Sequence, residues 1–383
     1  MLTDVAYRVA GMKLLKTQAR VITPTLLVLF FSILFVVFTL AKNHWDPFAF
    51  VLIGGKFDPR VDNPFYGYDG QFVYQIAVDP ANGWQYVDVP AYRYQRILYP
   101  MLVRLLSLGN PIVIPRILIV VNWLCLVINT WLIEGWLRKH GFNPWYALSV
   151  GGFAGLWLGL RLCLTEPLAF LLVLGGIRLF EQRNIWVSAL CFALALLTRE
   201  VTVLFALGVV VSLLFRRQFR LAFAWGSVVL LPFLAWQWIL WQWFGELGIR
   251  SGGAFSTPVE WLPYRAWWGV AFINLSLFLL MSIFVLPVGI LPSLIAIGAS
   301  IRTLTERPDS IASWVMLLHG LLIAVLPRSI LLDPSGLIRT LTGLVISVLF
   351  YGISNNSKRA LSYSLLGLFL MAFIVTDGLV PPH

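Results

Sequence analysis

The sequence predicts an all-α membrane protein that crosses the bilayer many times. Of its 383 residues, 59% are hydrophobic and 12% are charged, and the mean hydropathy is +0.84. A water-soluble globule of ordinary composition does not hide that much apolar surface. Apolar stretches also recur between charged clusters, and about 20 such residues in a helix span a hydrocarbon core of roughly 30 Å. Helices are expected because they satisfy their own backbone hydrogen bonds in lipid.

About eleven transmembrane helices are expected, within one integral membrane domain that covers residues 1–383. The first, at 21–41, follows four basic residues and is too long for a signal-peptide core, so we expect it to be retained. The expected spans are 21–41, 111–137, 144–161, 166–181, 185–199, 200–215, 221–244, 268–300, 311–327, 336–353 and 361–377.

The distribution of charge predicts the orientation. If the N-terminus is cytoplasmic, alternate loops that carry paired basic residues all lie on that side, as the positive-inside rule requires. These pairs include Arg138 with Lys139, Arg216 with Arg217, and Lys358 with Arg359. Most carboxylates then face outward, and the formal charge of +11 reflects cytoplasmic loops instead of a nucleic-acid partner.

The longest predicted loop, residues 42–110, lies between the first two spans on the external side. Its mixture of Tyr, Asp, Arg, Pro and apolar residues indicates an ordered segment. Apolar residues at helical spacing predict one interfacial helix over 66–78 and another over 93–108, where Pro100 is expected to kink or segment the helix.

Asp69, in the string YDGQF, is the first candidate for chemistry. It precedes Gly70 and is predicted to lie just outside the membrane, where a carboxylate can act as a general base toward a sugar hydroxyl. The alternative is a turn or N-cap aspartate ahead of the helix that contains Phe72.

Four ionisable residues fall at the predicted outer ends of short spans: Arg161, Glu166, Arg199 and Glu200. Ionisable groups at membrane depth indicate function by default. The arginines are candidates to hold a lipid phosphate, with the glutamates orienting them. The alternative is a set of structural ion pairs that lock the helix ends.

Arg328 and Arg339 lie at the external ends of two later spans and are candidates for the same phosphate site, or for snorkelling to lipid headgroups. The three cysteines lie in apolar segments without metal-ligand spacing. No P-loop, GxGxxG, HExxH or GxSxG pattern is present, so we expect neither a nucleotide cofactor nor a metal.

The run YDGQFVYQIAVDP, followed by PAYRYQRILYPML, resembles the first external loop of GT-C type glycosyltransferases, in particular bacterial relatives of the PIG-V mannosyltransferases. That family has an aspartate in this loop, then an aromatic-rich interfacial helix and an aromatic, proline-containing segment. The matching positions here are Asp69, Phe72, Tyr74, Tyr99 and Pro100. The chain differs from the family in having no sizeable C-terminal soluble domain and no evident pair of carboxylates for a metal.

The resemblance implies an inverting transfer of a sugar from a polyprenyl-phosphate donor to a hydroxyl on a lipid, glycan or protein acceptor. It places the protein in a bacterial inner membrane with a periplasmic or extracellular active face. Asp69 is then the base. The arginines that can neutralise the departing phosphate are Arg93, Arg96, Arg161, Arg199, Arg328 and Arg339, and the candidates for sugar contacts are Tyr68, Gln71 and Tyr94.

Two other classes of function stay open from the sequence. A transporter or flippase of a lipid-linked or anionic substrate also needs charged residues in the membrane, although it is expected to carry them through the midplane. A non-catalytic scaffold can keep the fold without the activity. The long external loop and the charges at one depth favour the enzyme.

Overall fold

The computed structural model describes residues 22–62 and 64–375, and every regular element in them is helical, with no strand in this part of the chain. The prediction of an all-α protein is confirmed. The basic residues ahead of the first span and the end of the predicted span 361–377 lie outside the described residues.

Within residues 22–62 and 64–375, five helices are long and apolar enough to cross a membrane, as expected of a helical membrane protein. The prediction of eleven crossings stays a prediction. Three shorter apolar segments accompany the five: α11 (Ile185–Thr198), η3 (Glu200–Thr202) running into α12 (Val203–Phe215), and α17 (Ile311–Ala324). Four of the five long helices are single elements: α2 (Pro24–Lys42), α7 (Ile114–Lys139), α13 (Phe219–Phe244) and α19 (Pro334–Ser354). The fifth, Leu275–Glu306, is continuous and consists of α15 (Leu275–Val285), the π turn η5 (Leu286–Ile290) and α16 (Leu291–Glu306).

Two predicted spans are not continuous helices. The segment expected at 144–161 is divided into η2 (Pro144–Ala147), α8 (Leu148–Gly151) and α9 (Ala154–Arg161), because Gly152 leaves the helical path and Phe153 is extended. The segment expected at 361–377 is divided into α20 (Lys358–Ser364), η6 (Leu365–Leu370) and α21 (Met371–Val375).

The turn between α9 and α10 (Glu166–Glu181) lies inside the protein, where no water satisfies its carbonyl groups. The amide of Asn122 in α7 donates to the carbonyl oxygens of Gly159 (2.8 Å) and Leu164 (2.9 Å). Seven residues, or about two helical turns, further along α7, Asn129 donates to the carbonyl of Pro167 at 2.9 Å. These bonds give buried carbonyl groups at the break a partner within the protein, and they attach the start of α10 to α7.

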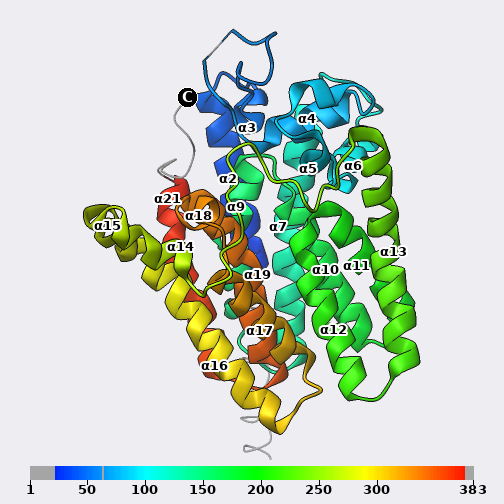
Figure 1. The fold of residues 1–383 in the computed structure, drawn as a ribbon, viewed down its shortest axis with the longest axis vertical. Coiled ribbons are helices and arrows are strands. Elements are labelled where there is room, and N and C mark those ends of the chain that lie inside the picture. The colour runs from blue at the N-terminus through cyan, green and yellow to red at the C-terminus, as the bar shows by residue number, and fades with distance from the viewer. Residues whose placement is uncertain (1–21, 63, 376–383) are drawn as a thin grey trace, which may run out of the picture.

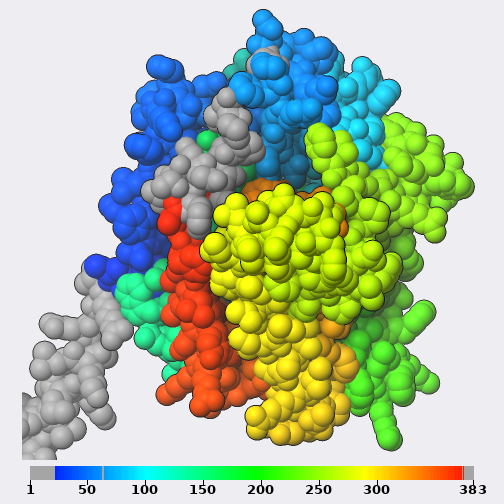
Figure 2. Space-filling model, turned by 60° about the vertical axis from the view of Figure 1, so that its left-hand side comes forward, coloured from blue at the N-terminus to red at the C-terminus, as the bar shows by residue number. Residues whose placement is uncertain are grey.

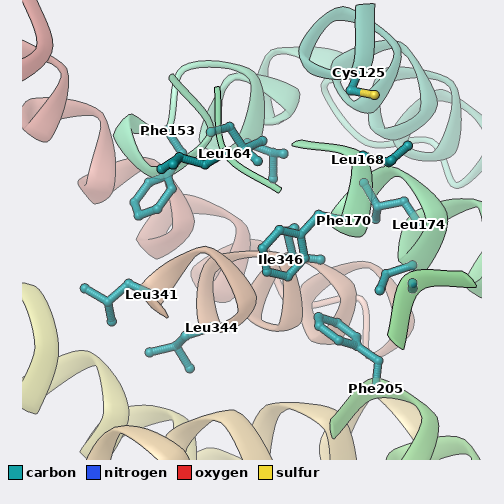
Figure 3. Packing of buried hydrophobic residues seen from close by; sticks show 14 of the residues in the cluster. Cys125, Phe153, Leu164, Leu168, Phe170, Leu174, Phe205, Leu341, Leu344 and Ile346 are labelled. Atoms are coloured by element: carbon teal, nitrogen blue, oxygen red, sulfur yellow. The ribbon is translucent and has the colours of Figure 1, made fainter. Parts of the chain in front are cut away.

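The core surrounds α10 and α19. Figure 3 shows Phe170 of α10 close to Ile346 of α19, with Phe205 of α12 nearby, and the side chains of all three are almost completely buried. Apolar contact of this density holds α10 and α19 at a fixed separation. The polar residues at the adjacent ends of these two helices are therefore held at a fixed separation as well.

The segments of the long first loop gather at one end of the bundle, the upper end in Figure 1, which we call the loop end. The helix predicted over 66–78 is confirmed as α4 (Asp69–Val78), whereas the one predicted over 93–108 is two helices, because residues 95–97 separate them. Pro100 lies in the first turn of the second, where a missing N–H costs no helical bond. The elements here are α3 (Phe48–Val51), α4, η1 (Gly83–Tyr86), α5 (Pro90–Tyr94) and α6 (Leu98–Leu106).

Residues 245–264, which we call the bridging loop, connect α13 to α14 (Arg265–Trp268) and run across the loop end (Figure 1). The chain continues through η4 (Gly269–Phe272) into α15, and α18 (Arg328–Leu331) precedes α19. In Figure 2 the first loop, in blue and cyan, forms the upper end of the molecule, and the yellow-green segment around α14 and α15 protrudes below it.

Candidate functional site

Asp69 is the first residue of α4, and Tyr68 occupies the N-cap position without a side-chain capping bond. The Asp69 carboxylate does not cap the helix. Instead, its Oδ1 accepts a hydrogen bond from Nη1 of Arg93 at 2.9 Å, and its Oδ2 accepts one from Nη1 of Arg339, also at 2.9 Å. The first loop and α19 therefore meet at this carboxylate.

Close backbone packing sets the position of Asp69. A Cβ atom on Gly70 would lie 2.2 Å from the carbonyl oxygen of Leu162, so only glycine lets α4 approach the turn between α9 and α10 this closely. Gly67 has a φ of +66°, and the N–H of Tyr68 donates to the carbonyl of Leu52 at 3.1 Å. The two glycines of the YGYDG string are thus required by the geometry of the backbone.

Arg93 of α5 is held on several sides. Its Nε and Nη2 donate to the two oxygens of Asp88 at 2.6 and 2.7 Å, a bidentate ion pair. Its guanidinium carbon also lies 4.3 Å from the centre of the Phe72 ring and 5.0 Å from that of Tyr92. One amino group is left over, and this is the one that reaches Asp69.

Arg339, in the second turn of α19, joins Asp69 to a fully buried carboxylate. Its Nε donates to Oε1 of Glu166, the first residue of α10. The same oxygen lies 2.8 Å from Nη1 of Arg199, which follows α11. The side chain of Glu166 has no exposure, so its charge depends on compensation within the protein, and these two guanidinium groups are paired with it directly.

Arg96, between α5 and α6, pairs with Glu200 at the start of η3. Its Nε and Nη2 donate to the two carboxylate oxygens at 2.9 and 2.6 Å, and Nη2 also donates to the hydroxyl of Tyr92 at 2.8 Å. This second bidentate pair ties the first loop to the junction between α11 and α12.

Together these groups form one network, which we call the arginine–carboxylate cluster. Four guanidinium groups face four carboxylates, so the formal charges cancel. The members are Asp69, Asp88, Glu166, Glu200, Arg93, Arg96, Arg199 and Arg339.

The electrostatics of the cluster keep Asp69 ionised. Burial alone raises the pKa of its carboxyl, but the charges of Arg93, Arg339 and Arg96 outweigh burial and hold that pKa well below its ordinary value. The pKa of the Asp88 carboxyl is also lowered, since its hydrogen bonds and charge interaction with Arg93 overcome the effect of burial. A permanently ionised carboxylate beside arginines is therefore the resting state of the site.

A small cavity of about 20 Å³ lies beside Asp69. Its walls come from α4, α5, α6, α19 and the turn before α10. A space of this size holds about one water molecule. The lining residues are Asp69, Phe72, Val73, Ile76, Arg93, Arg96, Pro100, Leu164, Thr165 and Arg339.

Two of the predicted site residues, Arg161 and Arg328, are not members of the arginine–carboxylate cluster. Arg161, at the end of α9, donates to the carbonyl of Ala49 at 2.6 Å, and its guanidinium lies over the ring of Phe50. Arg328, at the start of α18, lies against Gly269 and is not among the residues that contact Asp69.

The three predicted sugar contacts have different surroundings. The hydroxyl of Tyr68 is 2.9 Å from the hydroxyl of Ser335 and accepts from Arg339 at 3.1 Å, so it belongs to the site. Gln71 is buried and uses its amide on the backbone of Gly54 and Tyr66. Tyr94 is buried and donates to the carbonyl of Pro80. The last two therefore hold the loop together.

Asp88 and Tyr92 are not among the site residues expected from the sequence, although each contacts an arginine of the cluster. In the string DVPAYR, Asp88 precedes α5 and is five positions from Arg93, which is not the i, i+3 or i, i+4 spacing of a helical pair. Nothing in the sequence fixes which of the loop's aspartates faces inward.

The described residues contain no group of three or more His, Cys, Asp or Glu side chains close enough to hold a metal ion. The carboxylates of the cluster are matched with guanidinium groups instead. Comparison of the chain with protein-family models, with curated proteins and with solved structures finds no match.

Proposed function

We propose that the chain is a membrane glycosyltransferase that moves a sugar from a polyprenyl-phosphate donor to an acceptor hydroxyl, with Asp69 as the general base. The observation that carries the proposal is the contact of one ionised carboxylate with two arginines, Arg93 and Arg339, at one end of the bundle. The resemblance of the YDGQF segment to GT-C enzymes supplies the reaction.

The residue types fit the two halves of that reaction. Guanidinium groups bind phosphate through charge-assisted, bidentate hydrogen bonds, and their charge stabilises a phosphate that leaves. A carboxylate can accept the proton of the attacking hydroxyl. The site contains both, and the buried Glu166 and the partly exposed Glu200 orient the arginines on the side away from Asp69.

The low pKa of Asp69 implies an order of events. While Arg93 and Arg339 both donate to it, Asp69 is a weak base. A donor phosphate competes for the same guanidinium protons, and each hydrogen bond that the phosphate takes from Asp69 raises the basicity of that carboxylate. The donor thus activates the base by binding.

The distribution of charge supports an enzyme over a transporter. The ionisable groups of the cluster gather at the loop end, on the first loop and on the adjacent ends of α10, α11 and α19, and do not continue along the helices. A pathway across the membrane is expected to have polar groups through its middle.

The test is turnover by the purified full-length chain with a panel of polyprenyl-phosphate sugars, followed by mass spectrometry. We expect transfer to an acceptor, or slow hydrolysis, with at least one donor. Asp69→Asn is expected to abolish turnover while the protein still folds. Asp79→Asn is the matched control, because Asp79 ends the same helix and accepts only from Ala81 and Asn82 in its own turn.

Full turnover in the Asp69→Asn variant contradicts the role of Asp69. Flux of a lipid-linked sugar across liposomes containing the protein, with no turnover of any donor, contradicts the enzyme and favours the transporter or flippase.

A further inference from the structure

Asp88 is a member of the cluster that contacts both Arg93 and the bridging loop. Its side chain is 4% exposed, and both of its oxygens bind Arg93. The same Oδ2 atom also accepts a hydrogen bond from the backbone N–H of Ala254 in the bridging loop, at 3.1 Å. One carboxylate thus connects a phosphate-binding arginine to a loop from a distant part of the chain.

The bridging loop approaches this ion pair through a glycine. A Cβ atom on Gly253 would lie 3.3 Å from Nη2 of Arg93 and 3.5 Å from Oδ2 of Asp88. The contact is therefore already close without a side chain, and a larger residue would press on both members of the pair.

Beyond Asp88, the bridging loop is attached at its tip by few contacts. The ring of Phe255 lies 5.4 Å from that of Tyr66, and Thr257 exchanges hydrogen bonds with Ser329 of α18. Phe255 is 69% exposed. The bridging loop does not line the cavity itself, but it contacts the Asp88–Arg93 pair, of which Arg93 does. Compared with α4, α10 and α19, which are held by the core, this loop can move at lower cost.

The cavity beside Asp69 is too small for the proposed donor, so the site must widen before the donor binds. A space of about 20 Å³ does not admit a sugar phosphate. Binding of the proposed donor at this site therefore requires the residues around the cavity, Arg93 among them, to move apart.

We propose that Asp88 is a positioning residue that holds Arg93 for the donor phosphate and couples it to the bridging loop, so that loop closure and the orientation of Arg93 occur together. This inference rests on the proposed function, because the ligand is the phosphate of that donor. With the loop closed, Asp88 fixes two of the three nitrogens of Arg93 and directs the third toward Asp69 and the phosphate. With the loop open, Asp88 loses the Ala254 N–H.

The first test uses undecaprenyl monophosphate as the probe, bound to the full-length chain in detergent. We expect Asp88→Asn to weaken its affinity about tenfold or more, because an amide cannot accept both hydrogen bonds from Arg93. Asp88→Glu, which keeps the charge, is expected to recover part of the loss. Asp79→Asn is the control and is expected to bind like the unaltered chain.

Hydrogen exchange of residues 251–257 separates positioning from a merely structural role. In the unaltered chain the probe is expected to slow exchange of these amides, because it favours closure. In Asp88→Asn the probe is expected to leave exchange unchanged even at a concentration that saturates the variant. An affinity within twofold of the unaltered chain, or protection retained in the variant, overturns the proposal.

A reversible lock tests the movement of the loop. The side-chain oxygens of Thr257 and Ser329 are 3.3 Å apart, so cysteines at both positions are placed to form a disulfide. Oxidation of the Thr257→Cys, Ser329→Cys variant is expected to slow association of the probe at least tenfold, and reduction to restore it, with each single variant as control. Unchanged association in the oxidised form overturns the loop's part in the proposal.

These readouts need no turnover. Probe binding with loop protection, but without transfer of any sugar, contradicts the proposed function and leaves this inference standing. Sugar transfer by an Asp88→Asn variant that binds the probe as tightly as the unaltered chain supports the proposed function and contradicts the inference about Asp88.

Discussion

The carboxylates of Asp69 and Glu166 share a single guanidinium group, that of Arg339, whose Nη1 binds the first and whose Nε binds the second. Asp69 lies on the first loop, 27% exposed, and Glu166 starts a core helix with no exposure at all. The partly exposed carboxylate is thus held in place by an ion pair anchored in the protein interior.

Arg339→Lys is expected to lower the catalytic efficiency of sugar transfer at least tenfold. A lysine is a point charge and cannot donate along two separate directions to Asp69 and Glu166 as the planar guanidinium does. The measurement is kcat/KM with the best donor. Arg328→Lys is the matched control, because Arg328 lies outside the cluster, and an equal loss in both variants would show that the effect is not specific to the bridge.

Glu166→Gln is expected to destabilise the protein by about 3–5 kcal/mol, because it leaves the buried charge of Arg199 without its paired carboxylate and leaves Arg339 paired with Asp69 alone. Denaturant or thermal unfolding in detergent measures the effect. The double variant Glu166→Gln, Arg199→Gln removes the stranded charge of Arg199 and is expected to be more stable than Glu166→Gln alone. Additive losses in the double variant would mean that the two residues do not interact.

Gly70→Ala is expected to reduce both stability and transfer, because the new Cβ would lie 2.2 Å from the carbonyl of Leu162 and the start of α4 must shift. Since Asp69 is the adjacent residue, we expect kcat to fall more than tenfold. Gly175→Ala is the control: its Cβ meets no atom within 4 Å, and alanine favours a helix by up to about 1 kcal/mol over glycine. Equal behaviour of the two variants would contradict the close packing at Gly70.

The pH dependence of transfer follows from the lowered pKa of Asp69. A carboxyl whose folded pKa lies below its unfolded value of about 3.9 stabilises the fold above that value, and the stabilisation is lost as the pH falls through the lower folded pKa. Asp69 is therefore expected to contribute no acid limb to the rate between about pH 5 and 8. Arg93→Gln removes one of the charges that lower the pKa of Asp69, so the pKa of Asp69 is expected to rise in that variant.

The measurement is the pH profile of kcat/KM for the unaltered chain and for Arg93→Gln, with Arg328→Gln as the control for loss of a distant charge. An acid limb in the unaltered chain above pH 5, unmoved by Arg93→Gln, would be incompatible with the ionised resting state of Asp69.

Local pattern predicted the helix that contains Phe72, because amphipathic spacing is set by neighbours in sequence, and it made Asp69 the first candidate for chemistry. It also identified Arg93, Arg96, Glu166, Arg199, Glu200 and Arg339, which the structure brings together. Their pairing was beyond the sequence, since Asp69 and Arg339 are 270 residues apart and only the fold brings them together.

Hydropathy was a poor guide where the backbone turns inside the protein. The segment 144–161 is apolar throughout, yet it breaks at Gly152, and the break near Leu162 is supported by Asn122 of another helix. An average over apolar residues does not register a turn whose polar groups are satisfied from elsewhere in the fold. Gln71 and Tyr94 were placed at the site for a similar reason, because their polar atoms are used by backbone groups that only the fold brings near.

The asparagines of α7 have a consequence for biosynthesis. α9 has 8 residues and α10 has 16, so at 1.5 Å per residue neither reaches across a hydrocarbon core of about 30 Å. Three carbonyls at their junction, those of Gly159, Leu164 and Pro167, accept side-chain hydrogen bonds from α7. We therefore expect α9 and α10 to leave the translocon together and to assemble on α7, which is synthesised before them. Nascent chains that lack Asn122 and Asn129 are expected to fail at this assembly step and to be degraded.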